Sequence, residues 1–107
     1  MRVFIHADDF GLSRSINKTI LQTVDYGATS SVSIIPNGAY FNEAMSEFKK
    51  RKNLRLSIHI NISEGRPVLP ATEVSLLINQ HGHFKHSFIS LVFHYYFNTK
   101  ENRDRIL

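Results

Sequence analysis

Apolar residues in the first 62 positions recur with two alternating periods. Continuous or every-second apolar positions at 2–7, 29–35 and 54–62 predict strands, and apolar positions about four apart predict helices over 13–26 and 41–52. The order strand, helix, strand, helix, strand is typical of parallel sheets with right-handed crossovers. The sequence therefore predicts an α/β fold built on a parallel βαβαβ sheet, in a single domain that spans the chain.

The first and third predicted strands differ in pattern. Val3, Phe4 and Ile5 are continuously apolar, which indicates a strand buried on both faces, as in a parallel sheet. Along 54–62, leucine and isoleucine alternate with polar residues, so the polar residues share one face of the strand. Those polar residues are Arg55, Ser57, His59 and Asn61.

Capping signals mark the ends of both predicted helices. Ser13 is a good N-cap for the first helix, and Gly27 suits the position after its last turn. Asn42 is a candidate cap for the second helix. Its basic end, from Lys49 to Lys52, suits a helix C-terminus because the helix dipole favours cations there.

The pattern is less regular in the second half of the chain. Residues 74–78 are apolar, but the run is too short to distinguish a strand from a helix, and 80–84 predict a turn. The aromatic-rich run 88–97 favours a helix with Ser87 as N-cap. Residues 100–107 resemble the opening of a charged helix.

Composition and charge narrow the function classes. The chain has 107 residues, 42% hydrophobic and 21% charged, which is typical of a globular protein but short for a complete α/β barrel of about 250 residues. The net charge is +4, but the basic residues are scattered and form no stripe suited to binding nucleic acid. The absence of cysteine excludes disulfides and thiolate metal sites. We see neither a signal peptide nor a membrane-length run, and therefore expect a cytoplasmic location without membrane or nucleic-acid partners.

Candidate chemistry lies after the first strand, where Asp8 and Asp9 precede Gly11 and the N-cap Ser13. Two adjacent carboxylates repel each other unless a cation or a shared proton lies between them. Parallel strands bring the end of the third strand, with His59, to the same edge. Carboxylate and imidazole together suit zinc, manganese or a similar ion. Ordinary turn and capping chemistry for the aspartates, and a half-buried strand histidine, remain alternatives.

Four segments resemble one family. Residues 5–13, Ile-His-Ala-Asp-Asp-Phe-Gly-Leu-Ser, are similar to the amino-terminal signature of the YdjC-like carbohydrate deacetylases, which include the chitooligosaccharide deacetylases. The family usually has Asn where this chain has His6. Residues 30–38 resemble its second strand and turn, 59–67 its His-containing third strand and Glu-Gly-x-Pro loop, and 76–84 its Leu-Leu and Gly-x-Phe segment. The match runs in order over almost the whole chain and covers the amino-terminal half of the family.

The resemblance implies a TIM-barrel-like α/β fold, here partial over residues 1–107, and a divalent metal, which would be Mg, Zn or Mn. It implies removal of N-acetyl groups from amino sugars, with a small carbohydrate as substrate. Carried over by residue, Asp9 and His59 would be metal ligands and Asp8 the general base. Asn37 and Glu64 would contribute to substrate binding.

One departure from the family is serious. The third metal ligand and a further catalytic His lie in a later Asp-x-His-x-His-type segment of the family, which this sequence lacks. His81 and His83 are an alternative ligand pair within the predicted turn. We therefore keep two further interpretations: a non-catalytic truncated remnant, or a sugar- or metal-binding module. A small phosphate-binding module is a weaker third, since no Gly-rich loop follows the first strand. Half a barrel would also leave an open sheet edge, from which we expect a homodimer.

Overall fold

The computed structural model describes the backbone of residues 3–97 and the side chains of residues 3–93. The chain divides into two compact units, Met1–Asn61 and Ile62–Leu107. The first unit contains the sheet and two helices, and the described part of the second contains loops and one helix. Whether the whole chain acts as the single domain predicted from sequence stays a prediction.

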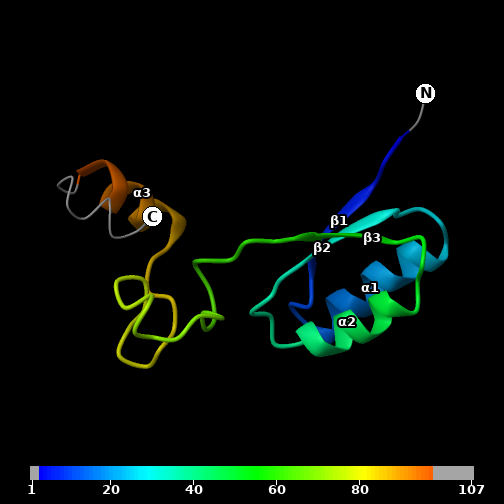
Figure 1. Ribbon diagram of the computed structural model, residues 1–107. Helices are drawn as coiled ribbons and strands as arrows, with labels where there is room; N and C mark the ends of the chain where they lie inside the picture. Colours follow the sequence, from blue (N-terminus) through cyan, green and yellow to red (C-terminus); the bar gives the residue numbers. More distant parts are fainter. Residues whose placement is uncertain (1–2, 98–107) are drawn as a thin grey trace. The chain divides into compact units, whose positions relative to one another are not determined.

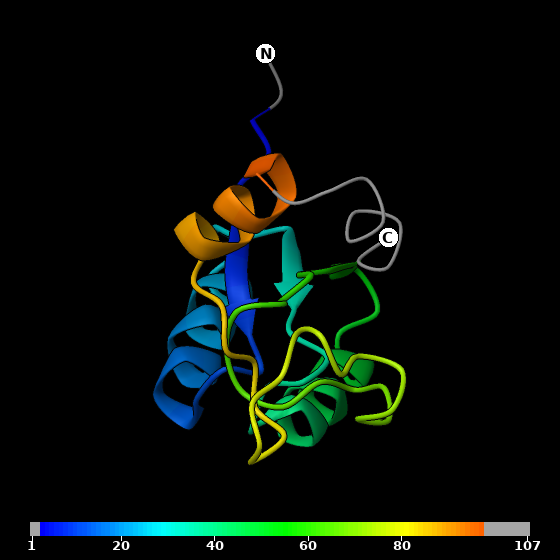
Figure 2. The same cartoon turned by 90° about the vertical axis from the view of Figure 1, so that its left-hand side faces the viewer.

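The first unit is a parallel three-stranded α/β sheet. Strands β1 (His6–Phe10), β2 (Ser31–Ile34) and β3 (Arg55–Ile58) pair in the order β1-β2-β3. Helices α1 (Arg14–Asp25) and α2 (Phe41–Lys49) connect them and lie on the same side of the sheet (Figure 1). The arrows of β1 and β2 point the same way (Figure 2). The predicted βαβαβ order is therefore confirmed.

Strand β2 separates an apolar face from a polar face. Val32 and Ile34 face the helices and are buried, and Ser31 and Ser33 alternate with them on the other face. The apolar side chains of the sheet and of both helices meet in one core. Its buried members are Phe10, Ile20, Val32, Ile34, Ala44 and Leu54. Burying a side chain of this kind stabilises the fold by about 1.5–3 kcal/mol, so the core fixes the helices to one face only.

The ends of α1 are capped as predicted. The Ser13 hydroxyl oxygen accepts a hydrogen bond from the Ile16 N–H at 3.2 Å, and Gly27 follows the helix with φ of 77°. The cap assigned to Asn42 is wrong, because Asn42 lies within the first turn of α2 and Tyr40 occupies the N-cap position. Tyr40 makes no side-chain cap hydrogen bond, and the turn before α2 is held by backbone contacts instead.

The apolar start of the chain is not buried. Val3, Phe4 and Ile5 are 69%, 62% and 50% exposed, so the prediction of burial on both faces is wrong. Backbone pairing with the neighbouring strand begins only where Ser30 N–H donates to Ile5 O, and β1 itself starts at His6. In the described sheet β1 is an edge strand, and of the described residues before it Phe4 has the Arg55 guanidinium 5.5 Å from its ring centre.

The basic segment after α2 does more than complement the helix dipole. Arg51 donates two hydrogen bonds of 2.8 Å to the Asp25 carboxylate at the end of α1 and one of 2.9 Å to the Glu47 carboxylate. The hydrogen bonds from Arg51 hold the pKa of Asp25 below its ordinary value. A planar guanidinium thus ties the ends of the two helices together.

The second unit confirms the predicted helix, α3 (Phe88–Phe97), with Ser87 accepting from the Ser90 N–H at 3.3 Å. Residues 74–78 form neither helix nor strand, apart from one antiparallel bridge between Ile78 and Phe84. Phe88 and Phe93 are exposed, and the predicted homodimer stays a prediction. The predicted helix at 100–107 lies outside the described residues.

In the part of the chain that the structure describes, no helix has the length and apolar character needed to span a membrane.

Two turns approach each other closely at the carboxyl edge of the sheet. A Cβ atom added to Gly38 would lie 2.3 Å from the Gly11 carbonyl oxygen, a distance that real Cβ atoms do not adopt. Tyr40 N–H donates to the same oxygen at 2.9 Å. Glycine at position 38 is therefore required for the turn after β2 to pack on the turn after β1.

Gly38→Ala should lower the free energy of unfolding by about 3 kcal/mol, because the added methyl group forces the two turns apart. The matched control is Gly27→Ala. Gly27 lies in the turn after α1 and has no atom within 4 Å of an added Cβ. The free energy of unfolding of Gly27→Ala should fall only by the cost of a left-handed backbone at alanine, about 1–2 kcal/mol. Urea unfolding measures both, and equal losses would contradict the close contact.

Candidate active site

The end of β1 and the turn after it each contain one residue with a left-handed backbone. Asp9 has φ of 67° and Gly11 has φ of 95°. The pairing register of β1 with β2 shifts between Ala7 and Phe10, so the strand is irregular where the two aspartates lie. Aspartate tolerates this conformation better than most residues. As a result, Asp9 does not follow the regular alternation of the strand and its carboxylate can reach across β2.

Asp9 and His59 are brought together at the carboxyl ends of β1 and β3. The pairing of β3 with β2 extends to His59, whose N–H donates to Ile34 O at 2.8 Å. The His59 Nδ1 atom lies 3.3 Å from Asp9 Oδ1. Parallel strands therefore place imidazole and carboxylate at one edge of the sheet, and the predicted proximity is confirmed.

The contact between these two groups is close but poorly aligned. His59 Nδ1 is buried and, among the described residues, has no hydrogen-bond partner despite the nearby carboxylate. A buried polar atom without a partner is costly and is usually satisfied in a native protein. An ion between nitrogen and carboxylate would satisfy both atoms.

Asp8 has different neighbours. Ser33 Oγ donates to Asp8 Oδ1 at 2.5 Å, and His6 Nε2 lies 3.3 Å from the same oxygen. His6 Nδ1 is in turn hydrogen-bonded to Ser31 Oγ at 2.7 Å. Two serines of β2 and the histidine of β1 therefore hold the Asp8 carboxylate on the polar face of the sheet.

These neighbours stabilise the ionised form of Asp8. The Ser33 hydrogen bond is the largest cause that lowers the pKa of Asp8, and the charges of His6 and His59 act in the same direction. Partial desolvation opposes them. Asp8 is thus ionised at neutral pH and able to accept a proton, although a lowered pKa also makes it a weaker base.

The remaining predicted site residues lie in both units. Asn37, in the turn after β2, accepts a hydrogen bond from Asn61 Nδ2 at 3.2 Å. Glu64 is exposed and belongs to the second unit. The backbone N–H groups of His81 and His83 both donate to Asn79 Oδ1, so these histidines form the predicted turn. The described residues contain no group of three His, Cys, Asp or Glu able to hold a metal.

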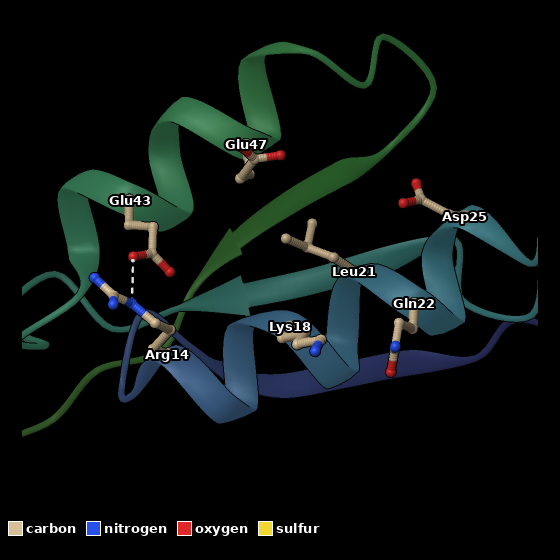
Figure 3. A pocket seen from close by; sticks show the side chains of 7 residues that line it. All are labelled: Arg14, Lys18, Leu21, Gln22, Asp25, Glu43 and Glu47. Atoms are coloured by element: carbon tan, nitrogen blue, oxygen red, sulfur yellow. Dashed lines mark hydrogen bonds and ion pairs between the residues drawn. The ribbon is translucent and has the colours of Figure 1, made fainter.

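A groove of about 320 Å³ lies between α1 and α2 (Figure 3). Arg14 and Glu43 form an ion pair of 3.3 Å at one end of it. The groove lies on the helix-covered side of the sheet, and Asp8, Asp9 and His59 do not line it. It is therefore separate from the candidate active site.

Sequence reasoning did not single out Ser31, Ser33 or Asn17. The two serines could have been found from the alternation along β2, which puts them on the polar face shared with Asp8. Asn17 is 1% exposed and lies within α1. No periodicity distinguishes it from a solvated polar residue, so only its tertiary contacts identify it.

The fold and the site define an α/β protein with a carboxylate and imidazole pair at the carboxyl edge of a parallel sheet. The chain belongs to the family described as YdjC-like protein, whose family model matches residues 2–106. The resemblance seen in the motifs is therefore confirmed.

The relatives are longer than this chain. A carbohydrate deacetylase of Thermoanaerobacter pseudethanolicus is 34% identical over 86 residues, which cover 80% of this chain and 34% of that protein. A carbohydrate deacetylase of Homo sapiens is 39% identical, covering 78% of this chain and 26% of that protein. The chain spans about a third of the length of the curated relatives that it matches.

A solved structure supports the same fold. It is a candidate cellobiose-phosphate cleavage protein from Enterococcus faecalis V583, with a TM-score of 0.74 and 28% identity. The similarity covers 83% of this chain and 35% of that one. The α/β arrangement of this chain thus occurs within a larger related protein.

Ser33→Ala should raise the pKa of Asp8 toward its ordinary value, because the carboxylate loses the O–H donor that stabilises its charge. Carbon-13 NMR titration of the carboxyl group measures the shift. Ser31→Ala is the matched control and should change this pKa less, since Ser31 contacts His6 and reaches Asp8 only through that ring. An Asp8 pKa that is the same in the wild type and in Ser33→Ala would show that this hydrogen bond is not formed in solution.

Proposed function

We propose that this chain carries the amino-terminal part of the active site of a metal-dependent carbohydrate N-deacetylase. The family and the relatives named carbohydrate deacetylase support the reaction class. The proposal of a metal is supported by the environment of His59 Nδ1. This buried atom has no hydrogen-bond partner among the described residues and lies 3.3 Å from Asp9 Oδ1.

The separation of these two atoms fits co-ligands of one ion. Ligand atoms that each lie about 2.0–2.2 Å from a tetrahedral zinc are roughly 3.3–3.6 Å apart, close to the observed distance. Asp9 and His59 would hold the metal through one oxygen and one nitrogen. A mixed set of this kind suits zinc or manganese better than magnesium, which prefers oxygen ligands.

The reaction is hydrolysis of an acetamide. The metal would polarise the acetamide carbonyl group and increase the acidity of water. Asp8, held ionised by Ser33, would accept a proton from the attacking water. The water oxygen bonds to the carbonyl carbon, the carbon–nitrogen bond breaks, and the amine nitrogen receives a proton. The products are acetate and a free amino sugar, and Asn37 would contact the sugar; the substrate role expected for Glu64 stays a prediction.

A second candidate is a sugar- or metal-binding module without catalysis. It is favoured by the ligand count, since the described residues offer Asp9 and His59 but no third ligand close to them. Metal affinity and turnover separate the two candidates. A cytoplasmic location and a homodimer remain predictions under either.

Millimolar zinc or manganese should stabilise the chain by about 1 kcal/mol, because two ligands bind an ion weakly. For a protein of this size that raises the melting temperature by roughly 4–8 °C. His59→Ala should abolish the shift, and His83→Ala should leave it unchanged. Micromolar binding by calorimetry would contradict this ligand count and would require a further ligand from the chain or from a second copy.

Deacetylation by the 107-residue chain alone should be absent or very slow. Loss of general acid help costs about 10²–10⁴-fold, and a weakly held metal lowers the rate further. Acetate release from a di-N-acetylated chitooligosaccharide, with added zinc or manganese, measures it. The Thermoanaerobacter pseudethanolicus relative is the positive control. Robust turnover that disappears in Asp8→Asn would show that these 107 residues suffice.

A further inference from the structure

Asn17 links the two turns at the carboxyl edge of the sheet. It lies in the first half of α1 and is 1% exposed. Its Oδ1 atom accepts a hydrogen bond of 2.7 Å from the Gly11 N–H. Its Nδ2 atom donates to Tyr40 O at 3.4 Å and to Glu43 Oε1 at 3.5 Å. One buried amide therefore contacts the turn after β1, the turn after β2 and the first turn of α2.

Both backbone groups of Gly11 are fixed by these contacts. Asn17 accepts from the Gly11 N–H, and Tyr40 N–H donates to Gly11 O at 2.9 Å. Gly11 itself is buried, so its N–H has no access to water if the side-chain acceptor is removed. Two residues earlier, Asp9 is held at φ of 67°, a conformation that a non-glycine residue keeps only when its surroundings enforce it.

We propose that Asn17 is a positioning residue for the metal pair, acting through the Gly11 N–H to hold Asp9 in the left-handed conformation that brings its carboxylate to His59. This inference rests on the proposed function only in naming the ion that the pair would hold. Asn17 does not contact Asp9, His59 or a substrate by any hydrogen bond of the described residues. Its effect is on the shape of the turn.

The first measurement needs no metal. In the wild type, the Gly11 amide should be protected from hydrogen exchange, and nuclear Overhauser contacts should join the Asp9 Hβ protons to the His59 ring. In Asn17→Ala and in Asn17→Leu, which better fills the space, the contacts between Asp9 and His59 should be lost while the sheet remains folded. A wild-type Gly11 amide that exchanges as in an open chain would overturn the inference without any variant.

The second measurement is the affinity for Mn²⁺, followed by paramagnetic broadening of the His59 ring signals. Removing the partner that orients a metal ligand typically weakens binding about 10–100-fold, and we expect about tenfold for Asn17→Ala. The double variant Asn17→Asp with Glu43→Gln keeps an oxygen acceptor for the Gly11 N–H. The change at Glu43 removes the repulsion between two carboxylates that Asn17→Asp alone would create. The double variant should retain affinity within about threefold of the wild type.

Thr23→Ala is the matched control for both measurements. Thr23 is a part-buried polar residue of the same helix that donates to Ile20 O at 2.7 Å and accepts from Thr29 at 2.9 Å, far from the turn. It should lower stability without changing the Asp9 to His59 contacts or the Mn²⁺ affinity. If a folded Asn17→Ala behaves like Thr23→Ala, the inference is wrong. If the wild type binds no Mn²⁺ but the loss of contacts occurs, the proposed metal site fails and the positioning role stands.

Discussion

The close approach of two turns is the constraint on which the site depends. Gly38 lies against the Gly11 carbonyl with no room for a Cβ atom, and the Asn17 side chain accepts a hydrogen bond from the Gly11 N–H. The turn after β1 is therefore rigid at the point where the chain reverses from strand to helix. That turn directly follows Asp9, which ends β1 in a left-handed conformation, so the packing of Gly38 on Gly11 lies two residues from the carboxylate that approaches His59.

The central strand β2 has a different role on each face. Val32 and Ile34 bind the helices through the core, and Ser33 on the opposite face holds Asp8 ionised. The two aspartates thus differ although they are adjacent. Asp8 is surrounded by donors, and Asp9 faces the ring nitrogen of His59. In the proposed reaction, Asp8 would accept the proton and Asp9 would bind the ion.

The chain is shorter than its relatives, and its described sheet has two edge strands. It spans about a third of its curated relatives, and in the described sheet β1 and β3 are both edge strands. Apolar residues next to these edges, such as Phe4 and Ile60, are exposed. A larger α/β protein, as in the Enterococcus faecalis structure, offers further elements to cover such residues.

The sequence by itself determined the order of strands and helices, the caps of α1 and the meeting of Asp9 with His59. Each follows from short-range periodicity or from the rule that parallel strands end at one edge. It did not determine where β1 begins, since exposure of Val3 and Ile5 depends on which strands lie beside them. Nor did it reveal Ser33 or Asn17 as partners of the site. Their roles arise from contacts between residues 6 to 26 positions apart, which only the packed tertiary structure brings within hydrogen-bonding distance.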